Sequence, residues 1–216
     1  SDSRYVIDPV SGVITTNQAL DREGPNPNTS YTVLARDNQG SGAYNQTSST
    51  VNIGINNVNE APGAPSSGAT VWSFFDESGL GSNPASAGGV VATFAMSDID
   101  GTVPSLQFAS NPGGWFEIVG NQVRWAAGVS FDYEVLRAQG YGINDWSGDG
   151  RTDAHIANVY VKANDGALDS AQTLLQVFIS NVNEAPSTPT GSWGNYFTET
   201  GLGSNPANSN VVAATF

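Results

Sequence analysis

The sequence contains no cysteine, so no disulfide holds the fold together, and this absence is compatible with either redox compartment. Only one histidine is present, and neither a Gly-x-Ser-x-Gly turn nor a phosphate-binding glycine-rich loop occurs. The parts that nucleophilic or phosphoryl-transfer chemistry needs are therefore missing. The sequence predicts a protein that is not an enzyme.

Basic residues are scarce: seven lysines and arginines face 20 acidic residues, which gives a formal net charge of -13. Nucleic acids and anionic membranes both require a basic surface, so neither is an expected partner, whereas cations are. No apolar run approaches the roughly 18 residues of a membrane span, and no signal peptide is visible. Direct membrane insertion is not expected, and any anchor or export signal should lie outside this sequence. The composition, rich in Gly, Ser, Thr and Asn, favours an extracellular or cell-surface location.

Two copies of one phrase organise the chain, because Asn57-Val-Asn-Glu-Ala-Pro62 recurs as Asn181-Val-Asn-Glu-Ala-Pro186. A second hexapeptide, Gly79-Leu-Gly-Ser-Asn-Pro84, recurs as Gly201-Leu-Gly-Ser-Asn-Pro206 with nearly the same period. Such self-similarity indicates a repeat array. We therefore expect the C-terminal part of one repeat at 1–62, a complete repeat at 63–186, and the opening strands of a third at 187–216.

Alternation of apolar and polar residues predicts strands directly before both copies of the phrase. Val51, Ile53 and Ile55 alternate in the first unit, and Leu175, Val177 and Ile179 in the second. Turn sequences such as Asp8-Pro-Val-Ser-Gly12 separate the strands, which favours an all-β fold of tandem antiparallel β-sandwiches, immunoglobulin-like and arranged in a linear array. Trp125 alternates with Val123 and is expected in the core.

The order of motifs in the middle unit resembles that of cadherin repeats, particularly the cadherin-like repeats of large bacterial surface adhesins. The first unit keeps the later motifs in the same order, including Leu20-Asp-Arg-Glu23 and its own linker. The motifs of the middle unit are Phe75-Asp-Glu-Ser78, Asp98-Ile-Asp100, Phe131-Asp-Tyr-Glu134, Ala163-Asn-Asp165 and the linker phrase Asn181-Val-Asn-Glu184.

In that family, these motifs gather between consecutive domains and bind calcium. The resemblance implies that the first junction uses Asp21, Glu23, Asn57, Asn59, Glu60, Asp98, Asp100 and Asp165. It implies that the second junction uses Glu77, Asp132, Glu134, Asn181, Asn183 and Glu184, with a further Asp-x-Asp motif beyond Phe216. The family linker usually begins with Asp and carries another Asn before its Ala-Pro, so fewer ions or weaker binding are expected here.

A second metal signal lies in the segment that lengthens the middle unit. Oxygen ligands at the first, third, fifth and ninth positions, with glycine at the sixth, suit a tight calcium loop. The segment resembles the FG-GAP calcium loops of integrin-type propellers and the first part of an EF-hand loop. Because Ile156 stands where an EF-hand has Glu, a hairpin loop is expected. The implied ligands are Asp145, Ser147, Asp149, the carbonyl of Arg151, and Asp153.

These features predict a calcium-binding structural or adhesive segment of a large extracellular repeat protein, rigidified by calcium at its junctions. Other cell-surface proteins, including copies of itself, or glycans are the expected partners. One alternative is a calcium-dependent carbohydrate-binding module, in which Trp146 is the tryptophan expected to be exposed. Another is a filament-forming subunit whose incomplete end repeats are completed by neighbouring copies.

Overall fold

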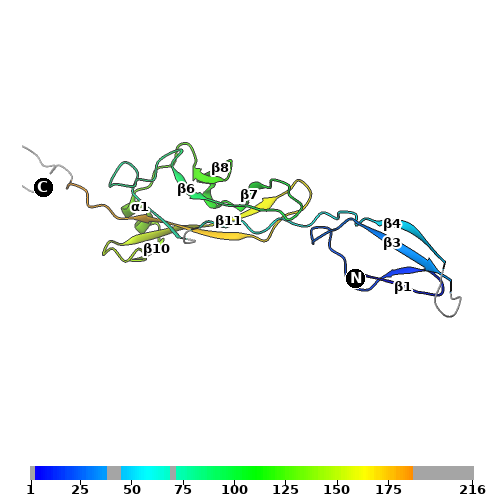
Figure 1. Cartoon of the computed structure of the whole chain (residues 1–216). Coiled ribbons are helices and arrows are strands. Elements are labelled where there is room, and N and C mark those ends of the chain that lie inside the picture. The colour runs from blue at the N-terminus through cyan, green and yellow to red at the C-terminus, as the bar shows by residue number, and fades with distance from the viewer. Residues whose placement is uncertain (1–2, 38–44, 69–71, 187–216) are drawn as a thin grey trace, which may run out of the picture. The chain divides into compact units, whose positions relative to one another are not determined.

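The computed structural model describes residues 3–37, 45–68 and 72–186 (Figure 1). The chain divides into two compact units, Ser1–Asn181 and Val182–Phe216. The predicted third repeat, 187–216, lies outside the described residues. The predicted repeat boundaries at 62 and 186 therefore stay predictions.

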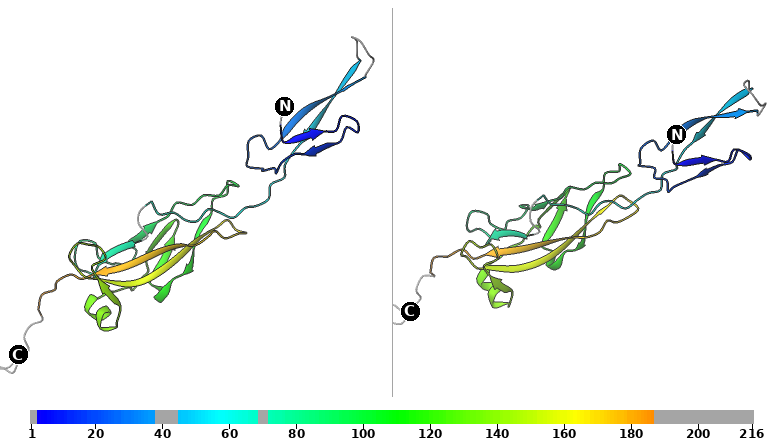
Figure 2. Two further views of the ribbon diagram at one scale, coloured as in Figure 1. Left: turned by 90° about the horizontal axis from the view of Figure 1, so that it is seen from below. Right: turned by 60° about the horizontal axis from the view of Figure 1, so that its bottom comes forward.

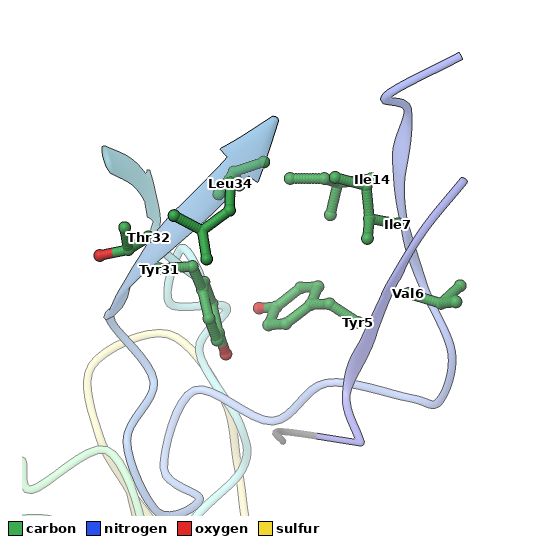
Figure 3. A pocket seen from close by; sticks show the side chains of 8 residues that line it. Tyr5, Val6, Ile7, Ile14, Tyr31, Thr32 and Leu34 are labelled. Atoms are coloured by element: carbon green, nitrogen blue, oxygen red, sulfur yellow. The ribbon is translucent and has the colours of Figure 1, made fainter. Parts of the chain in front are cut away.

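Two hairpins form the first part of the chain. Strand β1 (Tyr5–Ile7) pairs antiparallel with β2 (Ile14–Thr16), and β3 (Thr29–Arg36) pairs antiparallel with β4 (Gln46–Ile53). The hairpins meet through an edge-to-face contact of Tyr5 and Tyr31, with ring centroids 5.5 Å apart. Ile7, Ile14 and Leu34 line the cavity beside these rings, which has a volume of about 330 Å³ (Figure 3).

The main sheet of the middle unit has five strands in the order β10-β11-β12-β5, with β7 paired to the far end of β11. Figure 2 shows β11 and β12, in yellow and orange, side by side. The strands are β5 (Trp72–Asp76), β7 (Ser105–Ser110), β10 (Gly142–Asn144), β11 (Asp153–Asn164) and β12 (Thr173–Ser180).

A three-stranded antiparallel sheet, β6-β9-β8, forms the second layer. Between β8 and β7 lies a short 3-10 turn, η1 (Pro112–Gly114), and α1 (Tyr133–Ala138) follows β9. No helix in the described part of the chain is long and apolar enough to cross a membrane. The strands are β6 (Val90–Thr93), β8 (Phe116–Val119) and β9 (Gln122–Trp125).

The core between the two layers confirms the predicted fold class. Leu175, Val177 and Ile179 are at most 1% exposed, and Trp125 is fully buried against Phe116, with stacked rings 5.0 Å apart. One strand pair is not antiparallel as predicted: β5 runs parallel to β12. Parallel partners need a long connection, and here the whole repeat separates its opening strand from its closing strand.

The repeated hexapeptide Gly79–Pro84 forms a turn that wraps around the carboxylate of Asp76 at the end of β5. Asp76 Oδ2 accepts hydrogen bonds from the backbone N–H groups of Ser82 (2.7 Å) and Asn83 (2.8 Å). Gly81 has a φ of 68°, and a Cβ atom at this position would collide with the Asp76 carboxyl group. The sequence Gly-Leu-Gly-Ser-Asn-Pro therefore encodes a cradle for one buried carboxylate.

Replacing Gly81 with Ala should destabilise the protein by about 2–5 kcal/mol, because the new methyl group meets the Asp76 carboxylate in a left-handed backbone conformation. Gly79→Ala is the matched control: its φ is 81°, but nothing lies within 4 Å of its Cβ position. It should cost only about 1–2 kcal/mol. Urea unfolding of both variants measures the difference, and equal losses would contradict the cradle.

Candidate metal centres

Three carboxylates converge around the first linker. Glu23, Glu60 and Asp100 each offer an oxygen atom, and these oxygens all lie within 4.8 Å of one another. Glu23 precedes β3, Glu60 belongs to the linker phrase, and Asp100 ends the Asp-x-Asp motif after β6. Carboxylate oxygens at this density are the ligands that calcium prefers.

The linker is held to the Asp-x-Asp motif by donors to a single carboxylate. Asn57 donates its amide N–H to Asp100 Oδ1 (2.7 Å), and the backbone N–H of Glu60 donates to Asp100 Oδ2 (2.8 Å). Asn59 donates to Asp165 Oδ2 in the same way (2.8 Å). Both linker asparagines that the resemblance implied as ligands therefore contact carboxylates of the middle unit.

The other predicted ligands of the first junction have local roles. Asp98 accepts from the backbone N–H of Asp100 (2.9 Å) and from the Thr102 hydroxyl (2.5 Å). Asp165 accepts from the N–H groups that follow it, and Asp21 accepts from the N–H of Glu23 (2.9 Å). These carboxylates shape the turns that carry the converging group, but they are not among its three members.

The surroundings of Glu60 disfavour the ionised form of its carboxyl group. Desolvation raises the pKa of Glu60, and the nearby charges of Asp100 and Glu23 raise it further. The pKa of Asp100 is lowered, first by the Glu60 N–H and then by the Asn57 amide. Because the pKa of Glu60 is raised, its protonated form contributes to the stability of the folded state at low pH. This contribution is lost as the pH rises through the folded-state pKa of Glu60. Deprotonation of Glu60 adds a negative charge beside those of Asp100 and Glu23.

At the other end of the middle unit, Glu77 is 1% exposed, and its carboxylate accepts from the backbone N–H of Tyr133 (2.8 Å). Oxygens of Glu77 and Glu134 lie within 4.8 Å of each other. Asp132 caps α1 by accepting from the N–H of Val135 (2.9 Å), a helix start that the sequence pattern did not predict. Asn181 donates its backbone N–H to the carbonyl of Thr152 (2.9 Å). Predicted ligands Asn183 and Glu184 belong to the second unit.

The predicted hairpin loop is confirmed, because β10 and β11 pair with Asn144 opposite Asp153 and the loop lies between them. Asp145 accepts from the N–H groups of Gly148 (2.7 Å) and Gly150 (3.1 Å). Asp153 is fully buried and accepts from the Ser147 N–H (2.9 Å) and the Ser180 hydroxyl (2.6 Å). The carboxylates of Asp145 and Asp153 thus hold the loop in shape by accepting hydrogen bonds from its backbone.

Arg151 has a role that the loop spacing does not reveal. Its guanidinium donates to Asp149 Oδ2 (2.8 Å) within the loop and to Asp76 Oδ1 (2.6 Å) at the end of β5. The pKa of Asp149 is lowered by hydrogen bonds from Arg151, and that of Arg151 is raised by Asp76 and then by Asp149. Asp145, Asp149 and Asp153 form no three-carboxylate group within 4.8 Å among the residues that the structure describes.

Comparison with known proteins supports the fold but not a family assignment. No protein-family model and no curated protein matches the sequence. Drosophila N-cadherin EC1-4 matches with a TM-score of 0.51 and 16% identity over 83% of this chain and 40% of that chain. Human protocadherin-24 EC1-2 matches with a TM-score of 0.50 and 18% identity over 84% and 78%. The chain thus spans about two fifths of the N-cadherin structure, and it has a cadherin-like fold.

Proposed function

We propose that this chain is a calcium-binding structural segment of a large extracellular adhesive protein, in which calcium rigidifies the junctions between repeats. The observation that supports this most is the convergence of Glu23, Glu60 and Asp100. Two carboxylates about 4 Å apart repel by about 1 kcal/mol in water and by about 4 kcal/mol at an effective dielectric constant of 20. A divalent cation among the three adds an attraction to each carboxylate that outweighs these repulsions.

The linker asparagines suit a junction that exists in two states. Without a cation, the amide N–H groups of Asn57 and Asn59 bind Asp100 and Asp165. Rotation of each amide by half a turn exchanges its nitrogen for its oxygen, which is a calcium ligand. The proposed set for the first junction is Asp21, Glu23, Asn57, Asn59, Glu60, Asp98, Asp100 and Asp165.

The same principle extends to two further sites. The buried carboxylate of Glu77, beside Glu134, supports a second junction site with Asp132, Asn181, Asn183 and Glu184. The hairpin loop would bind a calcium ion through Asp145, Ser147, Asp149, Asp153 and the carbonyl of Arg151. For that, Asp149 must exchange the Arg151 guanidinium for the ion. Because calcium must compete with the Arg151 guanidinium for Asp149, we expect the loop to bind calcium more weakly than the junctions.

The cadherin-like fold is consistent with a non-enzymatic, extracellular adhesive role, and we propose other cell-surface proteins or copies of this chain as partners. Within the described residues, no specific contact favours the filament-forming alternative. In the proposed mechanism, ligands from the linker and from the repeat that follows it close around calcium and fix the angle between repeats. The linkers bend more freely when calcium is removed.

Removing calcium with a chelator should lower the melting temperature and raise the flexibility measured by small-angle X-ray scattering. A ligand that binds only the closed junction stabilises it by about 2.7 kcal/mol at 100 times its dissociation constant. Glu60→Gln should shrink the calcium-dependent difference. Glu117→Gln removes an exposed carboxylate outside all proposed sites and should leave it unchanged. Identical curves with calcium and with chelator would exclude the mechanism.

Asn57→Asp should have opposite effects in the two states. Without calcium, the pKa of Asp100 should rise, because an amide donor is replaced by a like charge. With calcium, affinity should increase, because an anionic ligand replaces a neutral one. Asn57→Ala, the control, should raise the Asp100 pKa less and weaken calcium binding. Carboxyl NMR titration and calorimetry measure both, and an unchanged Asp100 pKa in both variants would refute the contact.

At the hairpin loop, Asp149→Ala should remove one calcium ion from the stoichiometry measured by native mass spectrometry, while the junction ions remain. Arg151→Gln should instead strengthen calcium binding at the loop, because Asp149 no longer has an internal cation as a partner. Glu117→Gln again serves as the control. If neither variant changes stoichiometry or affinity, the loop is not a metal site.

A further inference from the structure

The outer face of the five-stranded sheet, turned away from the core, carries side chains in three transverse rows. Cross-strand register places one residue of each of β5, β12 and β11 in every row. Neighbouring strands lie about 4.8 Å apart, so a row across four strands spans about 14 Å. The rows are Trp72, Gln176 and Asn158; Phe74, Phe178, His155 and Gly142; and Asp76, Ser180, Asp153 and Asn144.

The middle row forms the centre of a ring cluster. Phe178 stacks on Phe74 and on His155, with ring centroids 4.7 Å and 4.9 Å apart. Trp72 and Trp146 contact Phe178 from further away, at 5.7 Å and 5.2 Å. Trp146 lies over Gly142, where a Cβ atom would stand 3.6 Å from the indole, an ordinary van der Waals contact. The tryptophan predicted to be exposed is therefore half-buried within this cluster.

The cluster is not needed to fill the sandwich core, which lies on the opposite face of the same strands around Phe75, Val159 and Val177. An antiparallel sheet with one solvated face ordinarily alternates apolar and polar side chains, with the polar ones outward. Here Phe178 is 2% exposed, whereas Trp72 at the edge of the cluster is 40% exposed. The exposed ring of Trp72 and the half-buried ring of Trp146 are therefore the aromatic surface that this face offers to a ligand.

The polar groups beside the rings are neutral or already paired. Asp76 is paired with Arg151, and Asp153 accepts from Ser180. In the row beside the rings, His155 and Gln176 both contact Oδ1 of Asn158, at 3.1 Å and 3.2 Å. Among the described residues no partner is recorded for the Asn158 amide nitrogen, and this side chain is exposed. The face thus offers aromatic surface and uncharged hydrogen-bonding groups.

We propose that this face binds a neutral oligosaccharide. The apolar C–H face of a sugar ring suits the exposed aromatic surface of Trp72 and Trp146, and its hydroxyl groups suit the amides of Asn158 and Gln176. An uncharged ligand complements a face whose charges are internally paired. The row of Trp72, Gln176 and Asn158 crosses three strands and spans about 10 Å, which favours a chain of linked sugars over a monosaccharide. This site is distinct from the carboxylate groups, and it binds whether or not calcium is present.

Affinity electrophoresis of the full chain in gels containing neutral polysaccharides (cellulose derivatives, xylan, mannan and β-glucan) tests the proposal. At least one polysaccharide should retard the wild-type protein, equally with calcium and with chelator. Trp72→Ala and Asn158→Ala should each weaken the retardation at least tenfold in dissociation constant. Asn158 is exposed, but its Oδ1 also contacts His155 and Gln176, so the melting temperature of each variant checks that the fold is retained. Val119→Ala, which removes a 50% exposed apolar side chain from β8 in the other sheet, should retain binding.

Three results would overturn the proposal: no retardation by any polysaccharide, retardation that Trp72→Ala and Asn158→Ala leave unchanged, or retardation that requires calcium. A concentration-dependent dimer that Trp72→Ala disrupts would also overturn it, because the face would then be an interface between copies. If the face binds no polysaccharide, the effect of chelation on melting and flexibility is unchanged. If the calcium sites do not exist, the retardation by polysaccharide is unchanged.

Discussion

The carboxylate of Asp100 holds two parts of the linker to the middle unit. Its two oxygens accept from the Asn57 amide and from the Glu60 backbone, and Asn59 adds a third hydrogen bond to Asp165. The contacts of Asp100 draw the charges of Glu60 and Glu23 close to it. Hydrogen bonds thus hold the junction together, while repulsion among the three carboxylates destabilises it. A divalent cation bound between them would offset this repulsion.

Features that depend on local sequence could be predicted. Leu175, Val177 and Ile179 are buried as expected, because a strand sends alternate side chains to the same face. Trp125 is in the core for the same reason. The hairpin between β10 and β11 follows from a glycine-rich acidic loop that lacks any helical continuation. The contact of the linker with Asp100 was foreseen only through the resemblance to cadherin repeats, which supplied the long-range pairing.

Features that depend on distant contacts could not be predicted. Asp132 caps α1 through the N–H of Val135, and the next N–H after Asp132, that of Tyr133, binds the buried Glu77 from 56 residues earlier. Arg151 reaches Asp76, 75 residues earlier in the sequence, and no local spacing records this pair. The aromatic row needs the parallel register of β5 on β12, which places Phe74 beside Phe178. For Arg151 and for Phe178, the decisive partner lies on β5.

Arg151 links the loop to the sheet in a way that allows the loop to change without disturbing β5. The guanidinium bonds Asp149 through Nε and Asp76 through Nη1, so the two contacts use separate nitrogens. A cation that takes Asp149 leaves the Asp76 contact intact. Asp76 is 4% exposed, and it would be costly to leave without a charged partner. The backbone cradle of Ser82 and Asn83 holds its other oxygen. Asp76, at one end of this outer row, is therefore held independently of the contact between Arg151 and Asp149.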